Sequence, residues 1–299
     1  MKKKILVAGG TGFLGYNLLK KLSNLNYSLY SLSTKKPKKD RKVKKVNYLI
    51  CDVFNKNKLQ TKLKCKYDYI VNFSGYVDHS DKKKTIQSHY YGCKNLINFF
   101  KNKKIINFIQ IGSSMEYGTS NSPHKEIFKC NPVGNYGIAK YKATKYLRKI
   151  GSKINFPYTI FRLYQVYGPN QSKNRLIPIV IDSCLKNKNF GCTIGSQKRD
   201  FLYVDDLSKL IIKSIQKKPK NKIYNVGAGN KIKVKLLIKL INELVGFGNP
   251  IYGKIKMRKD EVQNNYPDIT QVKKDYLWKP GYNIKRGLEK TIKFYKKMN

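Results

Sequence analysis

The sequence predicts an α/β protein with a doubly wound parallel sheet and a smaller C-terminal lobe. Three observations support this prediction. Short apolar runs alternate with helix-like segments through the first half of the chain, a glycine-rich turn follows the first apolar run, and the pattern loosens beyond residue 168. Such alternation implies a parallel sheet that helices cover on both faces, with ligands at the carboxyl ends of the strands.

The spacing of apolar residues sets where each element is expected. Residues 4–8 form an apolar run that ends at glycine, and apolar residues then recur at helical spacing through Leu22, which indicates a strand, a tight turn and a helix. Further strands are expected at residues 28–32, 48–51, 69–73, 105–111 and 158–166, and another helix is expected to end near residue 100. In the C-terminal part, helices are expected at residues 177–185, 207–215 and 231–245, the last being amphipathic and ended by Gly246.

The glycine-rich turn has the spacing of a dinucleotide site. Gly9 permits a tight turn, Gly12 lets the backbone approach a pyrophosphate, and Gly15 lets helix and strand pack closely. The expected cofactor contacts within the turn are Gly9, Thr11, Gly12, Phe13, Leu14 and Gly15. We therefore expect residues 1–168 to form a Rossmann-like dinucleotide-binding domain. Residues 169–299 would form mostly a substrate-binding lobe, with segments near 199–226 returning to the first domain.

The residues after the second expected strand favour NADP over NAD. A fold that prefers NAD places a carboxylate about 20 residues beyond the glycines, where it binds the ribose 2′-hydroxyl. This chain has hydroxyl and ammonium groups there instead, among them Ser33 and Lys35. A 2′-phosphate is therefore tolerated, and NADP is expected, with NAD as the alternative.

The composition argues against several other classes of protein. A net charge of +46 would suit a nucleic-acid binder, but only seven of the 63 basic residues are arginine, the side chain that reads base edges and clamps phosphates. Six cysteines without C-x-x-C spacing and three histidines predict no metal site. The apolar stretch at residues 5–19 is broken by four glycines and resembles neither a signal peptide nor a membrane span. We expect a cytoplasmic protein that binds neither nucleic acid nor membranes.

Three side chains indicate proton transfer. Tyr136 and Lys140 are four residues apart and would share one face of a helix, where an ammonium near a phenol favours the phenolate. Taken alone, that spacing would usually be a surface pair. Ser113 follows the fifth expected strand, at the sheet edge where ligands bind, and could orient a substrate oxygen. Beside a dinucleotide site, Ser113, Tyr136 and Lys140 are therefore the candidate catalytic residues.

Together these motifs resemble an extended short-chain dehydrogenase/reductase of the nucleotide-sugar epimerase/dehydratase family, over essentially the whole chain. The resemblance also includes CDV at residues 51–53, RLYQVYGP at 162–169, RDFLYVDD at 199–206 and LWKP at 277–280. Beyond the turn, and besides Ser33 and Lys35, it implies further contacts with the cofactor. These are Asp52, Val53, Phe73, Ser74, Gly75, Tyr136 and Lys140. It further implies that Arg199 and Arg258 clamp the diphosphate of a nucleotide sugar, that Ser114 and Gln165 contact the substrate, and that the protein is a homodimer.

Departures from the family narrow the expected reaction. The family's 4,6-dehydratases carry an Asp-Glu pair after the catalytic hydroxyl, where this chain has Ser114 and Met115. His89 stands where Asn is usual, and, like His79 and His124, it is interpreted as structural. We expect an NAD(P)-dependent nucleotide-sugar 4-reductase or 4-epimerase. A 4,6-dehydratase that uses Glu116 is the closest alternative, and a non-catalytic dinucleotide-binding regulator or scaffold is the alternative of another class.

Overall fold

The computed structural model describes residues 2–78, 80–258 and 261–298, and the chain divides into two compact units. Unit 1 takes up residues 1–120, 126–163 and 208–224, and unit 2 takes up residues 121–125, 164–207 and 225–299. Neither unit is one continuous segment of the chain. The division into domains at residue 168 therefore stays a prediction about function rather than a description of these units.

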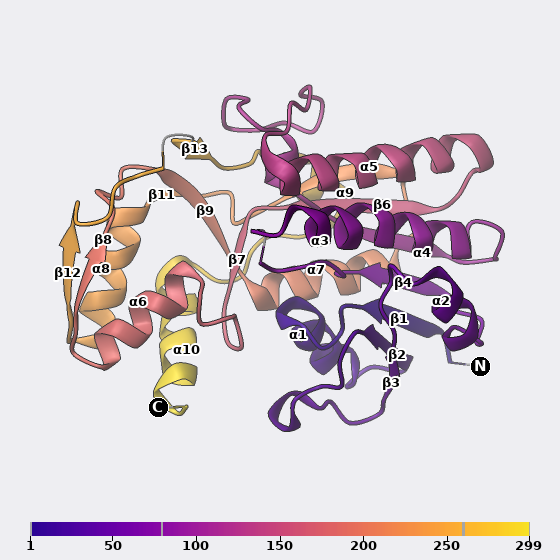
Figure 1. Ribbon diagram of the computed structural model, residues 1–299, viewed down its shortest axis with the longest axis horizontal. Coiled ribbons are helices and arrows are strands. Elements are labelled where there is room, and N and C mark those ends of the chain that lie inside the picture. The colour runs from indigo at the N-terminus through magenta and orange to yellow at the C-terminus, as the bar shows by residue number, and fades with distance from the viewer. Residues whose placement is uncertain (1, 79, 259–260, 299) are drawn as a thin grey trace. The chain divides into compact units, whose positions relative to one another are not determined.

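Unit 1 is built on a seven-stranded sheet with the strand order β10-β6-β5-β4-β1-β2-β3 (Figure 1). All pairs from β6 to β3 are parallel. The strands are β1 (Lys4–Ala8), β2 (Ser28–Ser33), β3 (Val46–Ile50), β4 (Tyr69–Asn72), β5 (Asn107–Ser113), β6 (Tyr158–Leu163) and β10 (Lys222–Val226). The strand order reverses between β1 and β4, which is where such sheets bind ligands. The predicted α/β fold class is confirmed.

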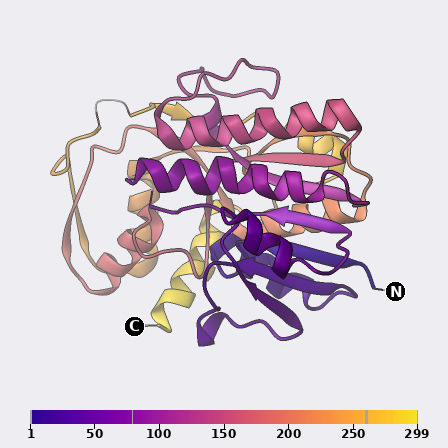
Figure 2. The same cartoon turned by 45° about the vertical axis from the view of Figure 1, so that its right-hand side comes forward.

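The helices of unit 1 cover this sheet and explain its continuous apolar strands, which are buried on both faces. The helices are α1 (Phe13–Leu22), α2 (Lys56–Lys62), α3 (Lys82–Ile86), α4 (Gly92–Phe100) and α5 (Gly134–Ile154). Short turns η1 (Lys39–Arg41), η2 (Gln87–Tyr91) and η3 (Ser114–Glu116) complete the unit, η2 being a π-helical turn. Figure 2 shows α4 and α5 running side by side. Leu6, Ile70, Leu96, Phe108 and Leu147 lie in the core between sheet and helices.

Unit 2 combines two small sheets with a group of helices. Its four-stranded sheet contains β7 (Gln165–Tyr167), β9 (Lys198–Tyr203), β11 (Lys231–Lys233) and β13 (Asn264–Asn265), and β8 (Asn189–Cys192) pairs with β12 (Asn249–Tyr252). The helices are α6 (Leu176–Leu185), α8 (Val234–Val245), α9 (Thr270–Tyr276) and α10 (Ile284–Lys296), while α7 (Val204–Gln216) starts in unit 2 and continues into unit 1. Apolar residues of α6, α8 and α10 form its core.

Two expected elements differ from the structure, and a third element was not expected. The single strand expected at residues 158–166 is two strands, because the chain leaves the large sheet at Tyr164 and β7 pairs with β9. Residues 231–233 form a strand that pairs with β9, so the helix expected from residue 231 begins only at Val234. Strand β9 itself was not predicted. Each of these strands is specified by pairing with distant residues, which local periodicity does not report.

In the part of the chain that the structure describes, no helix is both long enough and apolar enough to cross a bilayer.

Candidate active site

The glycine turn connects β1 to α1 at the point where the strand order reverses. Gly9 has a φ angle of +78°, which residues with a side chain rarely adopt. A Cβ on Gly9 would also lie 2.9 Å from the carbonyl carbon of Phe73, so the turn lies directly against the end of β4. Gly12 caps α1 without a side-chain hydrogen bond, which leaves the first N–H groups of the helix to a ligand such as a pyrophosphate. The first three residues of α1 are Phe13, Leu14 and Gly15.

The other predicted cofactor residues follow the neighbouring strands. The backbone N–H of Thr11 donates to the Ser33 hydroxyl at 3.2 Å, which ties the glycine turn to the end of β2. Lys35 is exposed two residues later. Beyond β3, Asp52 is exposed and accepts a hydrogen bond from a backbone amide two residues on, whereas Val53 is buried. The carboxyl ends of parallel strands thus bring these residues to one edge of the sheet.

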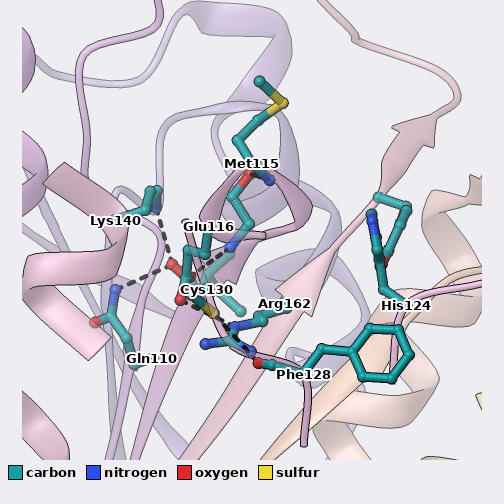
Figure 3. Close-up of polar contacts among 11 residues, drawn as sticks. Gln110, Met115, Glu116, His124, Phe128, Cys130, Lys140 and Arg162 are labelled. Carbon is teal, nitrogen blue, oxygen red and sulfur yellow. Dashed lines mark hydrogen bonds and ion pairs between the residues drawn. The ribbon is translucent and has the colours of Figure 1, made fainter. Parts of the chain in front are cut away.

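A chain of buried hydrogen bonds links the end of β4 to Lys140. The Ser74 hydroxyl donates to Asn72, and the Asn72 amide donates to Gln110 Oε1 at 2.8 Å. The side-chain amide of Gln110 and the Lys140 ammonium both donate to the carbonyl oxygen of Ile111, at 3.0 and 2.8 Å (Figure 3). Sequence reasoning missed Asn72 and Gln110. The two residues that bind each other are 38 apart in the sequence, so no local motif could indicate their contact.

The three candidate catalytic residues belong to adjacent elements of unit 1. Ser113 ends β5, and Tyr136 and Lys140 lie on the first two turns of α5. Lys140 is 5% exposed, and its Nζ lies 5.8 Å from the centre of the Tyr136 ring. A Cβ on Gly137 would lie 2.6 Å from the Met115 carbonyl oxygen, so the start of α5 packs directly on η3, the turn that follows Ser113. The structure therefore brings the predicted residues into one neighbourhood.

Glu116, the acid on which the dehydratase alternative depends, is occupied by other contacts. Its side chain is fully buried. Oε1 accepts a hydrogen bond from the backbone N–H of Ser113, and Oε2 is paired with Arg162 (Figure 3). Both carboxylate oxygens thus have protein partners.

His89 lies beside Tyr136, the candidate catalytic tyrosine. The His89 ring packs edge-on against the Tyr136 ring, with 5.0 Å between ring centres and 80° between planes. Its Nε2 is 3.0 Å from the carbonyl oxygen of Tyr76, and since a carbonyl only accepts, Nε2 carries the proton. The imidazole also fills the space into which a Cβ on Gly75 would project. This local hydrogen bond agrees with a structural role, but sequence gave no sign of the contact with Tyr136.

The remaining histidines lie elsewhere. His124 belongs to unit 2, where its Nδ1 is 2.8 Å from the Tyr164 hydroxyl. His79 lies outside the described residues. Among the described residues, no group of three or more His, Cys, Asp and Glu side chains is placed to hold a metal ion.

The predicted substrate residues are divided between the units. Arg199 on β9 forms an ion pair with Glu261, and its pKa is lowered by burial although the carboxylate opposes that effect. The backbone N–H of Glu261 donates to the carbonyl of Arg258, an exposed residue, so in unit 2 Glu261 contacts Arg199 through its side chain and Arg258 through its main chain. Gln165 is exposed at the start of β7 in the same unit. Ser114 is buried in η3 of unit 1.

Similar proteins share the whole length of this chain. A putative UDP-glucose 4-epimerase of Methanocaldococcus jannaschii is 29% identical and aligns over 99% of both chains. Human dTDP-D-glucose 4,6-dehydratase is 27% identical over 98% of this chain and 90% of its own. Among solved structures, UDP-glucuronic acid 4-epimerase of Bacillus cereus, in a mutant form bound to a fluorinated UDP-sugar and NAD, superposes with a TM-score of 0.91 at 20% identity. The superposition covers 99% of this chain and 100% of the B. cereus chain.

A protein-family model matches the part of the chain that contains the candidate catalytic residues. The model of the NAD dependent epimerase/dehydratase family matches residues 5–227, which is most of the chain and includes the glycine turn and all three candidate catalytic residues. With its reversed strand order, glycine turn and serine, tyrosine and lysine set, this chain belongs to the NAD dependent epimerase/dehydratase family of enzymes.

Proposed function

We propose that the protein is an NAD(P)-dependent nucleotide-sugar 4-epimerase or 4-reductase, acting at C4 of the hexose. The observation that carries this proposal is the anchoring of Lys140 to the Ile111 carbonyl, two residues before Ser113, with Tyr136 one turn earlier on the same helix. The chain's similarity to a putative UDP-glucose 4-epimerase and to a UDP-glucuronic acid 4-epimerase supports the proposal.

Each residue has one task in the proposed reaction. A bound nicotinamide cofactor would supply or accept the hydride at C4. The Tyr136 oxygen, in its phenolate form, would take the proton from the sugar C4 hydroxyl as a ketone forms, and the resulting Tyr136 hydroxyl would return it when the ketone is reduced. The Ser113 hydroxyl donates to the same sugar oxygen and orients it. The Lys140 Nζ lies 5.8 Å from the centre of the Tyr136 ring and is held there by its hydrogen bond to the main chain of β5, which places a positive charge beside the group that transfers the proton.

The residues at the sheet edge fit a dinucleotide. Gly9 and Gly12 carry no side chain at the turn where a pyrophosphate is expected, and Gly12 caps α1 without a side-chain hydrogen bond, which leaves the helix N-terminus to an anion. Ser33 ends β2 and the exposed Lys35 follows it, where a ribose 2′-substituent is expected. They support a site that accepts NADP as well as the NAD bound by the B. cereus structure. We infer a preference for NADP.

In unit 2, Arg199 and Arg258 are the proposed ligands of the nucleotide diphosphate. The guanidinium of Arg199 already pairs with a carboxylate, Glu261, and an oxyanion of the diphosphate would present the same type of acceptor. Ser114 and Gln165 remain proposed substrate contacts. We also propose that the protein forms a homodimer and works in the cytoplasm.

The test combines cofactor identification with a matched pair of variants. Mass spectrometry of the cofactor released from purified protein distinguishes NAD from NADP, and UDP-glucose, UDP-glucuronic acid, dTDP-glucose and their 4-keto forms are then assayed for turnover. Tyr136→Phe is expected to keep cofactor affinity and to lower turnover by about 10²-fold or more. Tyr141→Phe is the control, because Tyr141 and Lys145 repeat the same spacing on α5 outside the site. Normal turnover by Tyr136→Phe would refute the mechanism.

A further inference from the structure

A buried ion pair lies directly behind the catalytic serine. Arg162 Nε and Glu116 Oε2 are 2.9 Å apart, and their side chains are 3% and 0% exposed (Figure 3). Glu116 is the last residue of η3, and Arg162 lies on β6, the strand that pairs with β5. The pair therefore connects the turn after Ser113 to a neighbouring strand inside unit 1.

Both charged groups have a second partner that fixes their direction. Glu116 Oε1 accepts the backbone N–H of Ser113 at 2.9 Å, so one carboxylate holds both the serine and the arginine. The Arg162 guanidinium lies over the Tyr117 ring, with its central carbon 4.6 Å from the ring centre. Burial is the largest single influence and lowers the pKa of Arg162, but interactions with Glu116, Tyr117 and Cys130 together outweigh it and raise the pKa. The Arg162 guanidinium therefore keeps its charge.

The same turn also contacts the helix that carries Tyr136. The Ser113 hydroxyl accepts the N–H of Met115 at 3.2 Å, and the Met115 carbonyl packs against Gly137 so closely that a Cβ there would lie 2.6 Å from it. Turn η3 is thus held on one side by β6, through the ion pair, and on the other by the first turn of α5. A shift of η3 would move Ser113 relative to Tyr136.

We propose that Glu116 and Arg162 are positioning residues, whose ion pair sets the place of η3 and thereby the geometry of Ser113 and Tyr136. A buried ion pair is weak evidence of stabilisation, because removing two charges from water costs about as much as their attraction returns, and apolar pairs of similar size are often as stable. An apolar pair, however, makes no hydrogen bonds and so does not fix the orientation of the two side chains. The inference rests on the proposed function, which gives Ser113 and Tyr136 their roles.

The test separates stability from positioning. Glu116→Ala and Arg162→Ala each leave one buried charge unpaired, so both are expected to lower the melting temperature. The double variant Glu116→Leu/Arg162→Met removes both charges while keeping apolar volume, and we expect its melting temperature to return close to that of the parent. Its turnover should nevertheless stay about 10-fold or more below the parent, with a smaller change in KM, since small displacements of catalytic groups cost turnover steeply.

Two further measurements complete the experiment. Restoring only the acceptor for the Ser113 N–H, with Glu116→Gln/Arg162→Met, should recover part of the lost turnover. Amide hydrogen exchange at Ser113 should be faster in the Leu/Met double variant than in the parent, while the other amides of β5 keep their rates. Replacing the exposed pair of α6, Asp182→Asn/Lys186→Met, is the matched control for charge and should change neither turnover nor exchange at Ser113.

The outcomes distinguish this inference from the proposed function. If Ser113→Ala and Tyr136→Phe retain normal turnover, the proposed function is wrong. If those two variants lose turnover while the Leu/Met double variant works like the parent, the positioning inference is overturned. A double variant that is as unstable as the single variants would also overturn it, because the pair would then serve stability alone.

Discussion

Lys140 shows at the residue scale how this site is held in place. A lysine that is only 5% exposed must have a partner for its charge, since an unpaired buried ammonium is strongly unfavourable. That partner is the carbonyl of Ile111, which also accepts from Gln110. The ammonium therefore has little freedom to leave the neighbourhood of Tyr136. Strand β5 ends at Ser113 and its main chain holds Lys140, so both candidate catalytic residues are positioned by the same strand.

Removing either proposed diphosphate ligand should affect the sugar substrate more than the cofactor. We expect Arg199→Ala and Arg258→Ala each to raise KM for the nucleotide sugar by about 10-fold, the usual worth of a charge-assisted hydrogen bond, with little change in KM for the cofactor. Arg199→Lys should recover only part of the loss, because an ammonium cannot make the bidentate contact.

Arg286→Ala is the control for the loss of one positive charge. Arg286 lies on α10, where its guanidinium stacks on the ring of Tyr282, and it is not a proposed ligand. Steady-state kinetics with each substrate varied in turn decide the matter. Equal effects on both substrates, or the same effect from the control variant, would contradict the assignment.

Dehydration of a nucleotide hexose should be slow in this enzyme. Loss of the C6 hydroxyl needs one group to protonate it and another to remove the C5 proton. Ser114 is a poor acid, Met115 cannot transfer a proton, and both oxygens of Glu116 already have buried partners. The measurement is the ultraviolet absorbance that 4-keto-6-deoxy products develop in base, with dTDP-glucose and UDP-glucose as substrates. A strong signal would favour the dehydratase alternative, and Glu116→Gln would then be the first variant to assay.

At the scale of elements, the π-helical turn η2 holds the loop after β4. Two side chains of this turn bind the backbone of Tyr76. His89 donates to the carbonyl oxygen of Tyr76, and the Ser88 hydroxyl accepts from its N–H at 2.9 Å. The loop that contains Gly75 is therefore fastened to η2. π-helical turns are frequent at functional sites, and here the turn also places an imidazole edge against Tyr136.

This packing predicts a coupled pair of substitutions. Gly75→Ala would place a methyl group where the His89 ring lies, and overpacking of this kind costs about 1–3 kcal/mol. His89→Ala opens that space, so in the double variant Gly75→Ala should cost much less than it does alone. Urea unfolding of the four proteins measures the coupling. Purely additive free energies of unfolding would show that the two residues do not share this space.

Sequence predicts the elements of unit 1 better than those of unit 2 for a physical reason. Buried parallel strands such as β1 and β4 are mostly apolar, so their composition identifies them. Strand β11 is only Lys231–Lys233, with one half-buried residue, and it exists because it pairs with β9. The same limit applies to the site. The glycine turn and the Tyr136 and Lys140 spacing are local, whereas the contact between Glu116 and Arg162 spans 46 residues and needs the sheet to form.

For the whole molecule, the division of labour follows the two units. The candidate catalytic residues and all predicted cofactor contacts lie in unit 1, and the proposed diphosphate ligands Arg199 and Arg258 lie in unit 2. The residues proposed to act at the nicotinamide therefore all belong to unit 1. Recognition of the nucleotide portion of the substrate is assigned to the other, which is also the unit whose elements were harder to predict.

The net charge of +46 predicts how stability responds to salt. Like charges repel one another more strongly in the compact state than in the expanded chain, so a protein this basic is destabilised by its own charge. Raising the ionic strength from about 0.01 M to about 0.15 M shortens the Debye length from about 30 Å to about 8 Å, which screens this repulsion. We therefore expect the melting temperature to rise with sodium chloride over this range.

Screening also weakens attractive pairs, so the sign of the net effect is informative. Exposed pairs such as Lys186 with Asp182 and Lys239 with Glu243 contribute about 0–1 kcal/mol each, and with 17 acidic residues against 63 basic ones most cations lack an acidic partner. Relief of repulsion should therefore exceed the loss of attraction. Potassium chloride should act like sodium chloride, because screening depends on ionic strength and not on a specific site. A melting temperature that is flat or falls with either salt would mean that the lysines are spread too widely to repel one another appreciably.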